Sequence, residues 1–436
     1  MAGSLGVAGA AGVPGSAGGG GGGGRGGRGG EGGAGGVNLL SLRSHNGALL
    51  LDLLRRAGRT GMSRLELAER TGLTPQAVSK ITARLREDGL VTEAGRQAST
   101  GGKPRTVLRL VPEAGHAVGL HLDRDELRAV LVDLTGAVVG ERRTALDLGA
   151  GADAVLDVVV AGTEAVVACL TPGSDPGLGL GPSAGRSGAA TGADPGMGAG
   201  AGTGAVPGAE GLGGVGSTVL GVGVAMPGPL DHTHGVLHRV TGFPEWDGFP
   251  LRDALTRRLG VPVVLDKDTN AAALGLAVGG EGGAFAYLHL STGLGAGLVL
   301  GGAVHRGART GAGEFGHQVI QLDGPPCSCG NRGCVEALCL AAVARGDVDE
   351  AARVLGEGAA NLVGLLDIDL VLLGGRTVAA EEARFVRGVG AVLDARARRE
   401  GAGSPVPVRV ASGGGRAVAE GAAQLLLAPL FGRAEG

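Results

Sequence analysis

The chain has 436 residues, enough for two to three domains, yet 92 are glycine and only 2 % are aromatic. It contains no apolar run long enough to span a membrane, and its N-terminus lacks the charged start and short apolar stretch of a signal peptide. Five cysteines, an odd number, do not suit a disulfide framework, so we expect a cytoplasmic protein without membrane spans.

Glycine is concentrated in two tracts, residues 1–36 and about 171–217. Neither tract has hydrophobic periodicity, so each can bury too little apolar surface to offset the entropy of ordering. We expect a flexible tail and a flexible insert. An RNA-binding segment is the alternative for the tail, but only Arg25 and Arg28 support it.

Charge is unevenly distributed around the net value of −3. Residues 37–112 hold 13 Lys and Arg against 6 Asp and Glu, a surplus of +7, which leaves −10 for the rest. A basic block before an acidic body indicates a nucleic-acid-binding domain at 37–112 and a second domain at 113–436.

The basic block has the pattern of a helix-turn-helix. A helix over about 38–54 is followed by Ser63 and Glu66 in the spacing of a capping box. After a glycine turn, Thr74 can cap a further helix that runs to about Asp88. Its early polar residues would face the major groove.

A hairpin is predicted next, with strands near 90–93 and 106–111 and a basic tip, and it has the form of a wing. The alternative is a three-helix packing domain whose charges are solvated. We favour DNA binding because the cap, turn, tip and charge agree. The predicted DNA contacts are Thr74, Gln76, Ser79, Lys80, Arg84, Lys103 and Arg105.

From residue 113 onward, β-type runs alternate with helical ones, which indicates an α/β body. We expect two strands around the turn at 135–136, a helix over 147–170, and later strands that end in glycine or Pro-Gly turns.

Five motifs in this body resemble the ROK family of repressors and sugar kinases. They are AMPGPLD (225–231), DTNAAAL (268–274), STGLGAG (291–297), GAGEFGH (311–317) and CSCGNRGCVE (327–336). The resemblance implies an actin-like ATPase fold of two α/β lobes around a cleft. The N-terminal winged helix is similar to that of the family's transcription factors.

The cysteine motif predicts a structural zinc site. His317, Cys327, Cys329 and Cys334 supply one imidazole and three thiolates, which fill a tetrahedral shell and leave no position for water. A disulfide is the alternative, which the odd cysteine count disfavours.

The same resemblance implies a sugar site made of Asp268, Asn270, Glu314, His317 and Glu336. Asp268 matches the catalytic base of the kinases, and a turn-capping role is its alternative. The chain lacks the asparagine that the family commonly has before residues 244–246, which indicates a ligand different from the usual hexoses.

The kinases of this fold bind phosphate in an Asp-x-Gly-Gly-Thr-Lys-like loop, and here the equivalent is HLDRDE at 121–126. Its side chains block the backbone approach, and its acids would repel a triphosphate. The other glycine positions of the nucleotide site survive: Thr292, Gly293, Gly295, Gly374 and Gly375. We therefore expect no ATP binding.

Together these features predict a sugar-responsive transcriptional repressor. Its expected partners are operator DNA and a sugar or sugar-phosphate effector, and it is expected to form a homodimer or homotetramer. An ATP-dependent sugar kinase with a DNA-binding domain is the first alternative, and a body that only dimerises is the second.

Overall fold

The computed structural model describes residues 45–97, 105–170, 212, 217–240, 243–401 and 404–433. The glycine-rich tail, nearly all of the glycine-rich insert and Lys103 lie outside these ranges, so the expectations for them stay predictions. All the described residues belong to one compact unit, residues 35–436.

The helix-turn-helix forms as its caps predict. The side chain of Ser63 accepts a hydrogen bond from the Glu66 N–H, and the Glu66 carboxylate accepts one from the Ser63 N–H. Thr74 caps the third helix by accepting from the Ala77 N–H at 3.2 Å. The three helices are α1 (His45–Ala57), α2 (Arg64–Thr71) and α3 (Pro75–Glu87).

The wing is a three-stranded antiparallel sheet in the order β1-β3-β2. Its strands are β1 (Met62–Ser63), β2 (Val91–Gln97) and β3 (Arg105–Leu110). Strand β2 extends beyond the predicted 90–93, and the pairing register shifts between Glu93 and Gly95. Leu108 on β3 is fully buried among Leu50 and Leu54 of α1, so the wing and the helices share a core.

The first lobe of the body is a five-stranded sheet in the order β10-β7-β4-β5-β6. Strands β10, β7 and β4 are parallel, and β5 and β6 continue the sheet antiparallel. The strands are β4 (His116–Leu122), β5 (Glu126–Asp133), β6 (Val138–Ala145), β7 (Val219–Met226) and β10 (Val263–Lys267). We expected two strands around the turn at 135–136, but the structure has three, β4, β5 and β6, because the polar turn at 123–125 divides the first predicted strand.

The second lobe repeats this plan with the order β13-β12-β11-β14-β15. Its strands are β11 (Phe285–Leu290), β12 (Leu294–Leu300), β13 (Ala303–Val304), β14 (Leu370–Gly374) and β15 (Val408–Val410). Helices α7 (Val335–Ala344), α8 (Val348–Leu366), α9 (Arg376–Ala380) and α10 (Glu382–Glu400) belong to this lobe, and a small hairpin, β8 (Leu230–Asp231) with β9 (Val236–Leu237), extends from the first.

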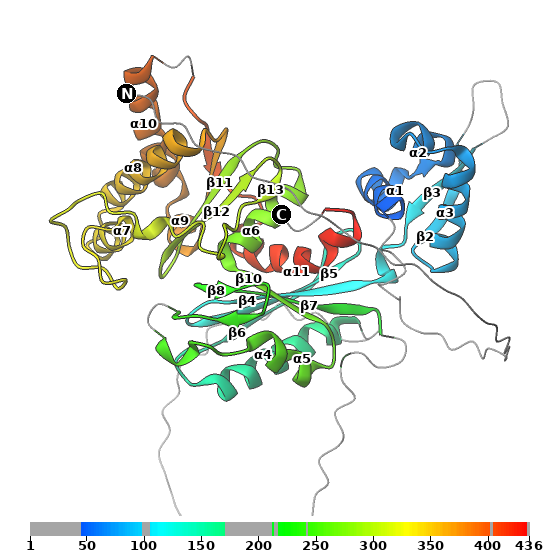
Figure 1. Ribbon diagram of the computed structural model, residues 1–436, viewed down its shortest axis with the longest axis horizontal. Helices are drawn as coiled ribbons and strands as arrows, with labels where there is room; N and C mark the ends of the chain where they lie inside the picture. Colours follow the sequence, from blue (N-terminus) through cyan, green and yellow to red (C-terminus); the bar gives the residue numbers. More distant parts are fainter. Residues whose placement is uncertain are drawn as a thin grey trace, which may run out of the picture. The chain divides into compact units, whose positions relative to one another are not determined.

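Two helices, α6 (Asp268–Gly279) and α11 (Ala417–Leu430), lie between the lobe sheets and pack against each other (Figure 1). They approach closely because glycine stands at the contact: a Cβ on Gly275 would lie 2.8 Å from the Gly421 Cα. A Cβ on Gly119 or Gly223 of the sheet would likewise overlap α11 backbone. The glycines thus let α6 and α11 approach each other and let the first sheet meet α11.

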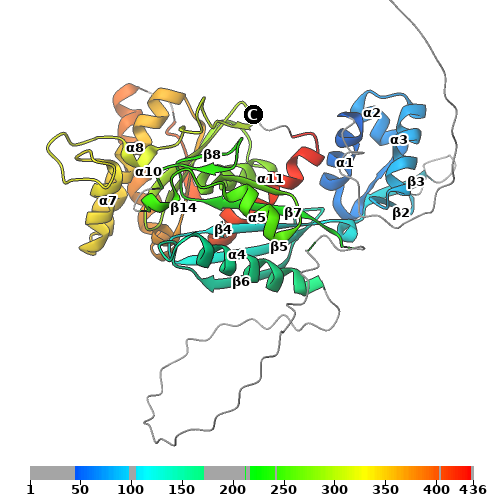
Figure 2. The same cartoon turned by 60° about the horizontal axis from the view of Figure 1, so that its bottom comes forward.

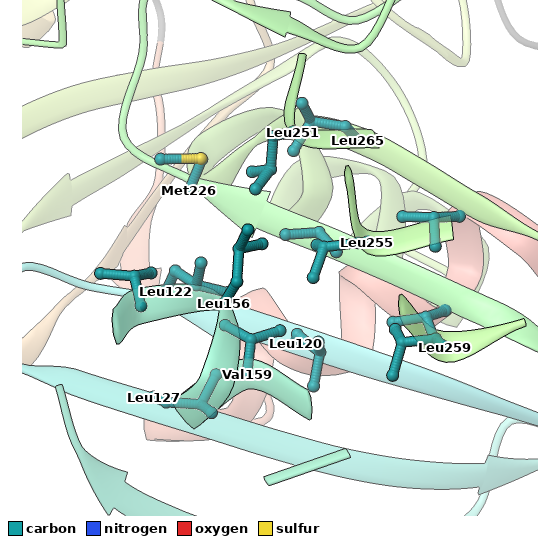
Figure 3. Packing of buried hydrophobic residues seen from close by; sticks show 14 of the residues in the cluster. Leu120, Leu122, Leu127, Leu156, Val159, Met226, Leu251, Leu255, Leu259 and Leu265 are labelled. Atoms are coloured by element: carbon teal, nitrogen blue, oxygen red, sulfur yellow. The ribbon is translucent and has the colours of Figure 1, made fainter. Parts of the chain in front are cut away.

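The outer face of the first sheet is covered by α4 (Ala152–Val167) and α5 (Leu251–Leu259) (Figure 2). Helix α4 is shorter than the predicted 147–170. Figure 3 shows its Leu156 and Val159 among buried side chains of the sheet, including Leu120 and Leu127. Within the part of the chain that the structure describes, no helix combines the length and hydropathy of a membrane span.

Candidate functional site

A polar cavity opens where the loops after the strands of both lobes meet. It collects residues from the β4–β5 turn, the end of β7, the β10–α6 junction, the β11–β12 turn and the start of α7. Its chemistry-bearing side chains are Asp123, Arg124, Lys267, Asp268, His289, Ser291, Thr292, Glu314, His317 and Glu336. Four of the five predicted sugar contacts therefore line one cavity.

Asp268 stands at the first position of α6, where its carboxylate accepts a hydrogen bond from the Thr269 N–H at 2.6 Å. Burial raises the pKa of Asp268 to about 7, against this hydrogen bond and the nearby Lys267 ammonium, both of which lower it. The carboxyl group can thus both accept and donate protons near neutral pH, as a general base requires. The bond to Thr269, the next residue, is not a helix cap, since the N-cap position of α6 is Lys267 and no side chain caps the helix.

Two acidic residues of the cavity are held by different partners. Glu314 pairs with the Lys267 ammonium at 3.1 Å, and this lysine side chain is only 3 % exposed. Glu336, in the first turn of α7, accepts a hydrogen bond from the Leu294 N–H at 2.8 Å. Each carboxylate keeps further acceptor capacity, which suits directed hydrogen bonds to hydroxyl groups.

Asn270 does not take the predicted place. It lies on α6, fully buried and outside the cavity lining, and its amide donates to Asp266 at 2.9 Å. Asp266 in turn binds Arg306 in a buried ion pair at 2.8 Å. The helical turn after Asp268 directs the side chain of Asn270 into this network, so its assignment to the sugar is corrected.

The former phosphate end of the cleft contains an ion-pair network that the sequence analysis missed. Arg376, at the start of α9, contacts Asp125 at 2.8 and 3.1 Å and Asp123 at 3.1 Å. Its Nε also donates to Ser291 Oγ at 3.1 Å. The acids of the degenerate loop are therefore compensated within the protein, and a guanidinium lies among them.

The remaining glycine positions divide into two groups. Thr292, Gly293 and Gly295 line the cavity. Gly374 and Gly375 do not, and they serve packing: a Cβ on Gly374 would lie 2.5 Å from the Tyr287 hydroxyl, and one on Gly375 would overlap the Leu290 carbonyl. Their retention carries no evidence for a nucleotide.

Two further residues of the cavity had no sequence signal. Arg124 lies over the Phe243 ring, 5.7 Å from its centroid, and has no salt-bridge partner within the described ranges. His289 is buried, which lowers its pKa to about 4, and its Nδ1 lies 2.8 Å from the Tyr287 hydroxyl. His289 is therefore neutral at physiological pH.

The predicted metal ligands converge beside this cavity. The ligand atoms of His317, Cys327, Cys329 and Cys334 all lie within 4.8 Å of one another, and the cysteines are not disulfide-bonded. Cys329 and Cys334 Sγ are 3.7 Å apart, and Cys327 Sγ is 3.6 Å from His317 Nδ1. Zinc bond lengths give tetrahedral edges of about 3.8 Å for S–S and about 3.6 Å for N–S, so the cluster fits this ion.

The third helix of the winged domain presents the predicted DNA-contacting residues to solvent. Val78, Thr82 and Leu85 are buried on its inner face. The outer face exposes Thr74, Gln76, Ser79, Lys80 and Arg84, and Arg105 is exposed at the start of β3. These side chains are free to reach a duplex.

Residues 49–92 match the winged helix-turn-helix DNA-binding family, and residues 212–343 match the ROK family. The chain is 26 % identical over 291 residues to the xylose repressor of Bacillus subtilis, an alignment that covers 66 % of this chain and 63 % of the repressor. It is 41 % identical over 128 residues to the glucokinase of Thermotoga maritima, which covers 28 % of this chain and 40 % of the kinase.

Among solved structures, the fold is similar to a ROK family transcriptional regulator described as a homologue of Escherichia coli MLC. The TM-score is 0.66 at 19 % identity, with 90 % of this chain and 97 % of the other covered. The two-lobed fold, the converging motifs and both family matches agree. The chain therefore carries a ROK family domain, with a winged helix-turn-helix DNA-binding domain in front of it.

Proposed function

We propose that the protein is a transcriptional repressor that releases operator DNA when a sugar or sugar phosphate binds in the cleft of the ROK domain. The observation that carries this proposal is the pairing of an exposed recognition face on α3 with a cavity of hydroxyl-binding side chains in the same chain. The likeness to a xylose repressor over 66 % of this chain supports it.

The effector site uses Asp268, Glu314, His317 and Glu336 as hydrogen-bonding groups. Closure of the two lobes around the ligand would move the attached DNA-binding domain, and a coupling of a few kcal/mol releases DNA. Arg124 suits either a neutral sugar or a sugar phosphate, since its guanidinium can stack on a ring or bind a phosphate group.

A structural zinc ion, held by His317 and the three cysteines, supports this cavity. When bound, the ion cross-links the loop before α7. His317 directs Nδ1 toward the cysteine cluster and also lines the cavity, so its other nitrogen, Nε2, remains available to a hydroxyl group. A dimer or tetramer would place two α3 helices on the half-sites of a near-palindromic operator.

The test is operator selection from a random DNA pool, followed by fluorescence anisotropy with a panel of pentoses, hexoses, hexosamines and their phosphates. Release of DNA by one member of the panel supports the proposal. Lys80→Gln should weaken operator binding and reduce the salt slope by about one. Arg239→Gln, an exposed charge of the body, is the matched control. Failure to select any sequence would refute DNA-binding regulation.

A sugar kinase is the second candidate, favoured by the position and raised pKa of Asp268. The Arg376 network opposes it, because the guanidinium and two carboxylates lie at the former phosphate loop. Calorimetric titration of Mg-ATP decides between them. Binding at micromolar to low millimolar strength would revive the kinase, and absence of heat alongside sugar-dependent DNA release would exclude it.

A further inference from the structure

A second cavity lies where α1 of the winged domain meets the body. Its volume is about 390 Å³, and it is separate from the candidate sugar site. Three arginines line it, Arg56 from α1, Arg306 after β13 and Arg433 after α11, and no acidic side chain does so among the described residues. The apolar part of its wall consists of Leu274, Val278, Val304, Leu425 and Pro429.

Three arginines at this junction, Arg55, Arg56 and Arg433, pair with the same carboxylate. The Asp52 carboxylate is the partner of Arg55 at 3.0 Å, of Arg56 at 2.6 Å and of Arg433 at 3.9 Å. Arg55 also lies over the Phe431 ring, 5.0 Å from its centroid. One carboxylate therefore faces three guanidinium groups that come from α1 and from the segment after α11.

Helix ends explain part of this arrangement. Helices α1, α6 and α11 all end here, and Arg433 donates to the Ala277 carbonyl at 3.1 Å. Each C-terminus carries about half a negative charge, which favours nearby cations. These dipoles favour Arg55 and Arg433, whereas Arg56 is held by Asp52 at 2.6 Å with its side chain 59 % exposed beside the cavity. Burial lowers the pKa of Arg433; the nearby Asp52 raises it, and Arg55 and Arg56 lower it further.

We propose that this cavity binds a small phosphorylated metabolite, with its phosphate between Arg56 and Arg433 and its organic part against the apolar wall. Guanidinium groups match phosphate oxygens in fork geometry, and two of them suit a dianion. Arg306 adds positive charge near the cavity but is not available for a bidentate phosphate contact, since its guanidinium is paired with Asp266 at 2.8 Å. The site is independent of the sugar cavity.

The site joins the DNA-binding domain to the ROK domain, so a ligand bound there can affect DNA binding. Arg56 belongs to the DNA-binding domain, whereas Arg433 follows the helix that separates the lobes. A phosphate bridging them strengthens the junction in whichever arrangement brings the two arginines together. It therefore changes operator affinity by the ratio of its affinities for the junction in the free and the DNA-bound protein.

The test is calorimetry of the full-length protein with inorganic phosphate and with glycerol phosphate, against chloride at matched ionic strength. We expect saturable binding that Arg56→Gln weakens about tenfold, the loss of one charge-assisted hydrogen bond. Arg56 is an exposed residue near the end of α1, so the variant should fold, as circular dichroism would verify. Arg239→Gln is the matched control.

Equal phosphate binding by the wild type and Arg56→Gln would overturn the proposal, as would wild-type heats no larger than those of chloride. A second readout is phosphate-dependent operator affinity, which in Arg56→Gln should need about tenfold more phosphate while the sugar response remains. If the wild type binds phosphate but no sugar changes its operator affinity, the proposed effector site is refuted, whereas the phosphate site at the junction is not.

Discussion

Replacing Arg376 by glutamine tests whether an internal ion pair has taken over the phosphate end of the cleft. Arg376 begins α9 of the second lobe, and Asp123 and Asp125 lie in the β4–β5 turn of the first. Its guanidinium therefore links the lobes across the cleft. Glutamine keeps part of the chain length and removes the charge, so the substitution deletes the link with little change in packing.

The expected loss follows from the exposure of each partner. Asp125 is 60 % exposed, and a pair of that kind is worth about 0.5 kcal/mol. Asp123 is only 11 % exposed, so its charge-assisted bond contributes about 1.5 kcal/mol, and the carboxylate left behind is poorly solvated. We expect Arg376→Gln to lower the free energy of unfolding by about 2 kcal/mol.

Urea denaturation measures this loss, provided that the dependence of the unfolding free energy on urea concentration (the m value) is the same for variant and wild type. The matched control is Arg353→Gln, because Arg353 makes two 2.8 Å bonds to Glu350 within the single helix α8 and should contribute about 0.5 kcal/mol. Adding Asp123→Asn to Arg376→Gln should restore roughly half the loss, since it neutralises the orphaned carboxylate. If Arg376→Gln costs no more than the control, the inter-lobe link is not a stabilising contact.

Three further predictions concern the cavity, the metal cluster and the central helices. The folded-state pKa of Asp268, about 7 against 3.8, makes stability fall as pH rises between these values, and the full shift is worth about 4 kcal/mol. Because the side chain lines the open cavity, part of this shift is screened, so Asp268→Asn should stabilise the protein by about 2 kcal/mol at pH 8, and an unchanged melting temperature would contradict this. Cys329→Ser should reduce zinc, measured by mass spectrometry, from about one ion per chain to near zero and weaken sugar binding at least tenfold. Gly421→Val should cost about 3 kcal/mol or more in urea unfolding, since its Cβ would overlap the Ala271 carbonyl, whereas Gly390→Val at an open position of α10 should change stability by less than about 0.5 kcal/mol, because valine is a slightly better helix former than glycine.

The sequence predicted best where local chemistry determines structure. The Ser63 capping box, the Thr74 cap and the convergence of His317 with the cysteines were all confirmed, because each depends on short spacing or on a motif with one geometry. The zinc ion itself stays a proposal. Local spacing also explains the error at Asn270, since two residues beyond Asp268 a helix turns the side chain to another face.

Ion pairs between segments far apart in the chain could not be predicted from the sequence pattern. Arg376 lies more than 250 positions from Asp123, and no periodicity relates them. Arg124 and Phe243 are likewise joined only by the fold. The acidic turn was expected to repel phosphate, and the structure pairs both Asp123 and Asp125 with the single guanidinium of Arg376, which balances part of that negative charge. The absence of ATP binding stays a prediction.

The Arg376 link joins the two lobes across one end of the cleft, which bears on how an effector could act. In a two-substrate kinase, both ligands contribute binding energy to lobe closure, whereas here the Arg376 link contributes on one side of the cleft at all times. Under the proposed function, the energy for closing the cleft then comes from the contacts of the effector, for which Asp268, Glu314 and Glu336 are the proposed residues. Weakening the Arg376 link should then shift the effector concentration needed for DNA release without changing which sugar is recognised.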